Sequence, residues 1–356
     1  MSKTIGILTA GGDCAGLNAV ISSIVKVGTP KGYDFVGFHK GWEGVLTPVM
    51  CQKLDLEAVR GIGHLGGTIL GTTNHGRFAA KVGRGEHAQI DPNILKEAKA
   101  NLDELGIDGL IVVGGDGTLA GATQLAQIGV KIVGVPKTID NDLSSTDVTF
   151  GFSSAVSVAV DALDKIHTTA TSHDRVFFVE CMGRTAGWIT LYAGLATNAN
   201  AILIPEFKFD IDDFIAFLQS YVENRGAAII AVAEGMSLHL KSYEQAIGSE
   251  VKLAGASNKL MSIIEAKHPG KFEMRNVILG HTQRGGGPNA EDRILAKRYG
   301  IAAFEAYAQG KFNHMVRLAN GIISAVPIAS AVGATKLVTK DDPVYKAAVA
   351  LGLYIN

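Results

Sequence analysis

Three short loops and a set of basic residues could do chemistry, and they follow apolar runs of the sequence. The first, Thr-Ala-Gly-Gly-Asp-Cys-Ala-Gly-Leu-Asn, spans residues 9–18. Backbone N–H groups at such a turn, with a helix behind them, form an anion site. A tight strand–helix turn would need the same glycines for steric reasons. The residues alone leave these two interpretations open.

The second loop, Gly-Gly-Asp-Gly-Thr, occupies residues 114–118. Glycines let the backbone come close to phosphate groups, and Asp116 can hold Mg²⁺ directly or through water. A turn without a ligand is the alternative. The position of the loop directly after a buried strand favours the functional interpretation.

The third loop, Pro-Lys-Thr-Ile-Asp-Asn-Asp, occupies residues 136–142. Phosphoryl transfer needs a carboxylate beside the attacking hydroxyl and positive charge around the moving group. An Asx-rich turn would explain Asn141 and Asp142, but it leaves Lys137 and Thr138 unused. The residues therefore favour a catalytic loop.

The fourth set is basic and follows later apolar runs. Arginine binds phosphate through two parallel hydrogen bonds, although a single arginine is more often part of a surface ion pair. The set consists of His173, Arg175, Arg184, Arg275, His281 and Arg284. Glu234 ends another apolar run and could accept hydrogen bonds from sugar hydroxyls or serve as a helix-entry carboxylate.

Uninterrupted apolar runs alternate with segments of helical spacing along the chain. Such runs are typical of strands buried on both faces of a parallel sheet, and the alternation predicts βαβ units. The expected strands are 5–10, 109–113, 131–135, 175–180, 201–205, 227–233 and 276–279; the expected helices are 95–105, 119–128, 156–168, 212–224 and 251–267. Ligands of such folds bind beyond the carboxyl ends of strands, where the glycines and acids lie.

Composition excludes several classes of protein. The 356 residues are 47% hydrophobic and 19% charged, with a net charge of −1. This describes a well-cored chain with no global attraction to nucleic acid or acidic membranes, and no apolar stretch is long enough to span a bilayer. Cys14, Cys51 and Cys181 show neither metal-ligand spacing nor even pairing, so we expect a reduced, cytoplasmic protein.

Together, these loops closely resemble the 6-phosphofructokinase family from Ile5 to about Val332. The most specific pieces are Pro-Lys-Thr-Ile-Asp-Asn-Asp and Gly-His-Thr-Gln-Arg-Gly-Gly, whereas Gly-Gly-Asp-Gly-Thr is shared with NAD and lipid kinases. The resemblance implies two doubly wound, three-layer α/β domains with mainly parallel sheets and an active site in the cleft between them. The nucleotide domain would comprise residues 1–151 and about 283–333, and the sugar-phosphate domain residues 152–282 and about 334–356.

The resemblance also implies the role of each site residue. Asp140 would be the base toward the 1-hydroxyl of fructose 6-phosphate, with Thr138 positioning the reacting groups and Arg184 steadying the transferring group. The nucleotide would lie along Gly12, Gly115, Asp116, Gly117 and Thr118, with Asp116 binding Mg²⁺. The sugar phosphate would contact Thr138, Ile139, Asp140, Met182, Gly183, Arg184, Glu234, His281 and Arg284. Arg175 and Arg275 would reach this site from a neighbouring subunit of a dimer or tetramer.

The phosphoryl donor is argued from Gly117 and Lys137. Family members that use pyrophosphate typically carry aspartate at the position of Gly117, where a carboxylate would repel the α-phosphate of ATP. Lys137 matches the lysine of pyrophosphate users. Glycine combined with lysine resembles the mixed-substrate group of the family, so we predict ATP, with pyrophosphate as the alternative donor. Sedoheptulose 7-phosphate is an alternative acceptor, and a non-catalytic nucleotide sensor is the alternative from another class.

Two departures from the family pattern bear on these predictions. Asn74 replaces an arginine expected near the nucleotide phosphates, and Arg77 is the candidate to compensate for it. Ser22 and Ser23 replace an arginine of allosteric bacterial members, which puts regulation at that site in doubt.

Overall fold

A computed structural model describes residues 3–356 except 74, 79–81, 84–85, 88 and 237–254. Asn74 and the beginning of the helix expected over 251–267 lie outside the described residues. The chain divides into two compact units, each described here by itself. The first comprises residues 1–139, 143–154 and 284–335, and the second residues 140–142, 155–283 and 336–356. The expected active site between two domains stays a prediction.

A seven-stranded sheet forms the centre of the first unit, in the order β13-β12-β7-β6-β1-β2-β3. Its inner strands pair in parallel, and β3 and β13 are antiparallel edges. The strands are β1 (Lys3–Thr9), β2 (Tyr33–Phe38), β3 (Cys51–Lys53), β6 (Ile107–Gly114), β7 (Ile132–Pro136), β12 (His314–Ala319) and β13 (Ile322–Pro327). A separate hairpin pairs β4 (Val82–Gly83) with β5 (Glu86–His87).

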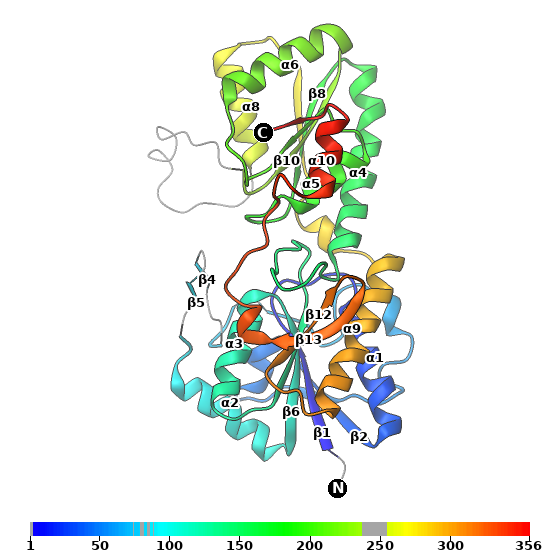
Figure 1. The fold of residues 1–356 in the computed structure, drawn as a ribbon, viewed down its shortest axis with the longest axis vertical. Coiled ribbons are helices and arrows are strands. Elements are labelled where there is room, and N and C mark those ends of the chain that lie inside the picture. Colours follow the sequence, from blue (N-terminus) through cyan, green and yellow to red (C-terminus); the bar gives the residue numbers. More distant parts are fainter. Residues whose placement is uncertain (1–2, 74, 79–81, 84–85, 88, 237–254) are drawn as a thin grey trace. The chain divides into compact units, whose positions relative to one another are not determined.

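Helices cover both faces of this sheet. They are α1 (Leu17–Gly28), α2 (Pro92–Glu104), α3 (Asp116–Gln127) and α9 (Ala290–Ala308). Figure 1 shows α2 and α3 on one face and α1 and α9 on the other. Leu102 and Leu119 pack with Leu110 of β6 in one buried cluster, which explains why the central strands are apolar without alternation. Short 3₁₀ turns lie at η1 (Thr29–Lys31), η2 (Gly41–Val45), η3 (Ile62–His64) and η5 (Ile328–Ser330).

The second unit has a wholly parallel five-stranded sheet in the order β11-β8-β10-β9-β14. Its strands are β8 (Val176–Cys181), β9 (Ala201–Leu203), β10 (Ala228–Ala233), β11 (Met274–Ile278) and β14 (Tyr354–Ile355). Its helices are α4 (Phe152–Ser172), α5 (Trp188–Ala196), α6 (Ile211–Arg225), α8 (Ala256–Lys267) and α10 (Pro343–Ala350), and η4 (Gly280–Arg284) leads back to the first unit.

The core of the second unit lies between its sheet and the pair α6 and α8. Phe214 of α6 and Leu260 of α8 pack against Phe178 and Ile230 of the sheet, and all four side chains are buried. Figure 1 shows α4, α5 and α10 on the opposite face. The predicted α/β architecture with mainly parallel sheets is confirmed.

Candidate active site

In the first unit, the glycine loops meet at the carboxyl ends of three adjacent strands. β7, β6 and β1 are neighbours in the sheet, so the loops that follow them share one edge. Ala10 N donates to Val113 O over 3.0 Å, and Lys137 N donates to Gly114 O over 3.0 Å. These bonds join the three loops that the sequence singled out.

A fourth motif, Gly-Gly-Thr-Ile-Leu-Gly-Thr at residues 66–72, is bonded to the first loop. Thr72 Oγ1 donates to Gly11 O over 2.6 Å, and Gly11 N donates to Thr73 O over 3.3 Å. Thr9 Oγ1 donates to Gly71 O over 3.1 Å. This motif therefore supports the position of the first glycine loop.

Two cationic side chains lie against the carbonyl groups of the first loop. The buried Lys137 donates its Nζ to Gly12 O, and Arg284 Nη1 donates to Asp13 O over 3.0 Å. A Cβ at position 12 would come within 2.7 Å of Arg284 Nη1. Glycine at this position thus permits the close approach of the guanidinium group, a contact that sequence reasoning did not predict.

Two helices begin at these loops. α1 follows Gly16, whose φ of 108° is in the left-handed region, and α3 begins at Asp116 after Gly115. N–H groups of the first turn and the positive end of the dipole attract anions at the amino end of each helix. Because β1 and β6 pair directly, with Thr9 opposite Val113, the two helices start at neighbouring strand ends.

The carboxylate of Asp116 suits a magnesium ion that is shared with a phosphate chain. Its Oδ1 accepts a 2.9 Å bond from Gly333 N, and a carboxylate has about four lone-pair positions. Among the described residues there is no cluster of three or more potential metal-ligating acids, histidines or cysteines. Mg²⁺ commonly needs only one or two carboxylates, with phosphates and water completing its octahedron, so the single carboxylate fits this mode.

In the second unit, a carboxylate site lies at the ends of β8 and β10. Glu234 Oε1 accepts bonds from Gly183 N at 3.2 Å and Arg184 N at 2.9 Å. These bonds hold the loop in an uncommon conformation, since Arg184 has a φ of 55°. The two loops meet because Ala233 pairs with Cys181 in the parallel sheet.

Asp140 belongs to the same unit and lies close enough to affect Glu234. Burial raises the pKa of Glu234, the charges of Asp140 and Glu180 raise it further, and the bonds from Arg184 and Gly183 act in the opposite direction. Asp140 is 4% exposed, whereas Arg184 is exposed. The second unit thus combines Asp140, Glu234 and the loop of Met182, Gly183 and Arg184.

Five further predicted residues lie in three other places. Thr138 O accepts a bond from Thr149 Oγ1 over 2.7 Å, and Ile139 is fully buried. Thr118 lies in the first turn of α3, as does Gly117, and His281 is exposed in η4.

Arg175 and Arg275 lie at the opposite end of the second sheet. Arg175 Nε is 2.7 Å from Glu273 Oε1, and Arg275 Nη2 is 2.9 Å from the same atom. Arg175 precedes β8 and Arg184 follows it. Since six strand residues span about 20 Å, the two ends of β8 cannot serve one small ligand.

Other polar side chains named from the sequence make contacts within the first unit. Arg77 Nη1 is 3.2 Å from Glu97 Oε2, and its Nη2 donates to Thr47 O over 3.0 Å. Ser22 Oγ donates to Val59 O, and Ser23 Oγ donates to Ala19 O. Burial raises the pKa of the Cys14 thiol to about 12, so this cysteine of the first loop is a neutral thiol.

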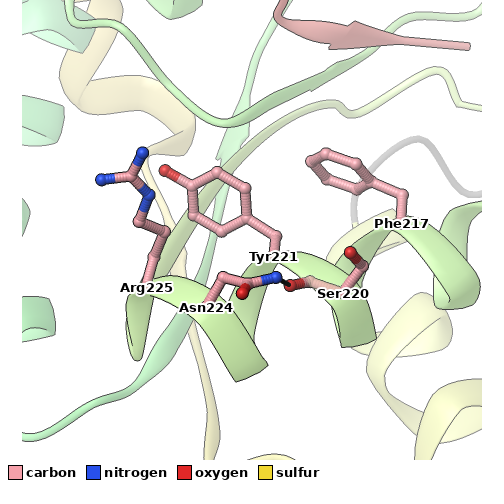
Figure 2. A pocket seen from close by; sticks show the side chains of 5 residues that line it. All are labelled: Phe217, Ser220, Tyr221, Asn224 and Arg225. Carbon is pink, nitrogen blue, oxygen red and sulfur yellow. Dashed lines mark hydrogen bonds between the residues drawn. The ribbon is translucent and has the colours of Figure 1, made fainter.

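A separate hollow of about 360 Å³ lies along α6 (Figure 2). Phe217, Ser220, Tyr221, Asn224 and Arg225 line it. Figure 2 shows these side chains on successive turns of the helix. None of them is a predicted site residue.

The comparisons with known proteins agree with the arrangement of these loops. A phosphofructokinase family profile matches residues 4–307. The pyrophosphate–fructose 6-phosphate 1-phosphotransferase of Streptomyces coelicolor is 45% identical over 349 residues, covering 96% of this chain and 97% of that protein. The chain belongs to the phosphofructokinase family. The predicted family is therefore confirmed.

Some relatives that are similar to this chain are named as ATP-dependent and others as pyrophosphate-dependent. ATP-dependent 6-phosphofructokinase 3 of S. coelicolor is 44% identical over 343 residues, covering 94% of this chain and 96% of that protein. The crystal structure of Pichia pastoris phosphofructokinase in the T-state matches with a TM-score of 0.78 and 32% identity, over 93% of this chain and 37% of the much longer Pichia chain. A pyrophosphate-dependent phosphofructokinase from Marinobacter aquaeolei has a TM-score of 0.79 at 20% identity and supports the fold alone.

No helix in the described part of the chain is both long and apolar enough to cross a bilayer.

Proposed function

We propose that the protein transfers the terminal phosphoryl group of ATP to the 1-hydroxyl of fructose 6-phosphate, giving fructose 1,6-bisphosphate and ADP. The observation that carries this proposal is the grouping of Asp140 with Glu234 and the Gly183–Arg184 loop in one unit. A base, a carboxylate for sugar hydroxyls and an exposed guanidinium are the groups that phosphoryl transfer to a sugar needs.

Asp140 accepts the proton of the attacking hydroxyl, which makes the oxygen a better nucleophile as the new P–O bond forms. Arg184 is exposed on a loop held by Glu234 and stabilises negative charge on the transferring group. Thr138 positions the reacting groups. Met182, Gly183 and Ile139 line the sugar, and His281 and Arg284 bind its phosphate.

The donor phosphates lie along the glycine loops of the first unit. The amino ends of α1 and α3 provide N–H groups and positive dipole ends at neighbouring strands. Asp116 holds Mg²⁺, which when bound neutralises developing charge on the phosphate oxygens. Gly12 and the residues Gly115–Thr118 let the backbone approach the phosphate chain closely.

Pyrophosphate is the second candidate donor, and two observations favour it. Lys137 places an ammonium group against Gly12 O in the first glycine loop. The pyrophosphate-dependent relative from S. coelicolor is also about as similar to this chain as the ATP-dependent one, at 45% and 44% identity. A one per cent difference does not decide between donors. We assign ATP as the donor because Gly117 lacks the carboxylate that would repel an α-phosphate at this position.

The active form is a dimer or tetramer in which Arg175 and Arg275 serve a neighbouring subunit. This part of the proposal is supported by the length of β8, which separates Arg175 from Arg184 by about 20 Å. Arg175 is therefore too far away to bind the same sugar phosphate as Arg184 in one chain. In the single chain both arginines are paired with Glu273. The cytoplasmic location stays a prediction from cysteine usage.

Steady-state assays that cross ATP and pyrophosphate with fructose 6-phosphate and sedoheptulose 7-phosphate test the proposal. We expect the highest kcat/KM for ATP with fructose 6-phosphate, and loss of turnover when Mg²⁺ is chelated. Gly117→Asp is expected to lower kcat/KM for ATP by at least tenfold through repulsion of the α-phosphate. A preference for pyrophosphate would establish the second candidate, and absence of turnover with every pair would refute the kinase function.

A further inference from the structure

Lys336, in the carboxyl-terminal segment of the chain, contacts the Asp140 loop with both its main chain and its side chain. This residue is in the second unit, as are residues 140–142. Lys336 N donates to Asp142 O over 2.8 Å, and Lys336 Nζ donates to Asn141 Oδ1 over 3.0 Å. Main chain and side chain of one residue therefore hold the two residues that follow Asp140.

The backbone conformation of Asn141 explains why the bond from Lys336 Nζ to its side chain matters. Asn141 has a φ of 51° and is only 3% exposed. A left-handed backbone is uncommon at residues other than glycine, although asparagine adopts it more readily than most, and surrounding contacts help to maintain it. The bond from Lys336 fixes the amide side chain of this residue, directly beside the proposed base.

Lys336 also contacts the segment that follows Arg184. Trp188 Nε1 donates to Lys336 O over 2.8 Å, and Lys336 Nζ lies 5.4 Å from the centroid of the Trp188 ring. Trp188 is 6% exposed and begins α5, four positions after Arg184. The same lysine thus joins the loop of the base to the helix behind the transition-state arginine.

The half-buried carboxylate of Glu206 fixes this segment two residues further along. Glu206 Oε1 accepts bonds from Val338 N at 3.1 Å and from Gly187 N at 2.8 Å. Gly187 is the residue before Trp188. The segment therefore has a defined register against the Arg184 loop. Lys336 cannot shift relative to that loop without breaking the bonds from Val338 N and Gly187 N to Glu206.

We propose that Lys336 is a positioning residue that fixes Asp140 and Arg184 relative to each other within the second unit. The catalytic part of this inference rests on the proposed function. A misplacement of about 1 Å at reacting groups can lower turnover about 100-fold. Loss of the Lys336 side chain should consequently reduce kcat more than it changes the KM for either substrate.

Lys336→Met tests the role of the side chain, because it keeps the length of the side chain and leaves the backbone bonds possible. We expect kcat to fall at least tenfold, with both KM values within about threefold of wild type. Lys336→Arg should restore most of the loss, since its guanidinium can donate to Asn141 Oδ1. Lys340→Met is the matched control: Lys340 is exposed in the same segment, with its Nζ 5.9 Å from the centroid of the Phe207 ring, and its removal should leave kcat unchanged.

Hydrogen–deuterium exchange provides a measurement that does not need turnover. Lys336→Met should speed exchange in peptides covering residues 138–143 and 183–188, and Lys340→Met should not. If wild type lacked activity, the proposed function would fail while exchange would still decide the positioning role. Should Lys336→Met not fold, Trp188→Phe removes the indole donor and is expected to speed exchange in the same peptides. Unchanged exchange and kcat in Lys336→Met, or equal effects in Lys340→Met, would overturn the proposal.

Discussion

Gly235 provides a direct test of how the Arg184 loop is held. A Cβ at this position would lie 1.7 Å from Arg184 O, a backbone atom. Ordinary van der Waals contact begins at 3.4 Å, so Gly235→Ala must move the Arg184 carbonyl or the Glu234 backbone by about 1.7 Å. A flexible side chain could rotate out of the way, but a backbone carbonyl can yield only by shifting the chain that carries it.

The displacement acts on the bonds between Glu234 and the loop. Glu234 Oε1 accepts from Gly183 N at 3.2 Å and Arg184 N at 2.9 Å, and a shift of this size exceeds the range of hydrogen-bond distances. Because a misplacement of about 1 Å can cost about 100-fold in rate, we expect Gly235→Ala to lower kcat by about 100-fold. Overpacking of this kind typically destabilises by about 1–3 kcal/mol, less than the roughly 5–15 kcal/mol by which native proteins are stable.

The assay follows fructose 1,6-bisphosphate formation at saturating substrates, with thermal unfolding measured alongside. Gly63→Ala is the control, since a Cβ there would meet only Ala19 Cα, at 3.9 Å, and it should retain wild-type kcat. If Gly235→Ala kept kcat within twofold of wild type while remaining folded, the claim that this packing positions Arg184 would be refuted.

Two further predictions concern buried carboxylates. Glu180 is 1% exposed and accepts bonds from Gly255 N, Ser257 N and Ser257 Oγ at the start of α8. Glu180→Gln should therefore lower the free energy of unfolding by about 2–4 kcal/mol. A change of less than about 0.5 kcal/mol in denaturant unfolding, which is typical of a neutral surface substitution, would contradict this. Burial raises the pKa of Asp292 above its ordinary value of 3.8, so the folded chain binds the proton of this carboxyl group more tightly than the unfolded chain does. The free energy of unfolding therefore falls as pH rises from about 4 through the raised pKa. Asp292→Asn should reduce that fall in a series of unfolding measurements from about pH 4 to 7, and an equal fall in both proteins would show that another group is responsible.

Seven of the twelve strands in the two sheets could be predicted, most of them because burial on both faces leaves a plain signal. The less buried strands β2, β3, β12, β13 and β14 were not predicted. The runs at 109–113 and 227–233 became β6 and β10, whose residues from Leu110 to Val113 and from Ala228 to Ala233 are almost completely buried. α9 gave no such signal, because Ile294 and Ile301 are exposed while Ala296, Tyr299 and Phe304 are buried. Apolar residues on several sides of this helix obscure its amphipathic pattern.

The residues of the candidate site were found from loop chemistry, but their supports depend on contacts between distant segments. Glu234 had two interpretations from sequence, and its bonds to Gly183 and Arg184 follow from β8 and β10 being neighbours. Lys336 lies 195 positions from Asn141, in a segment without any recognisable motif. Such pairings follow from strand order and chain crossings, which no local pattern encodes.

Asp140→Asn tests the central claim most directly, since the amide keeps the size of the carboxylate but cannot accept the proton of the hydroxyl. With ATP and fructose 6-phosphate, we predict that kcat falls by about 10²–10⁴-fold while the KM for the sugar phosphate changes little. A folded Asp140→Asn protein with turnover close to that of wild type would contradict the assignment of Asp140 as the base.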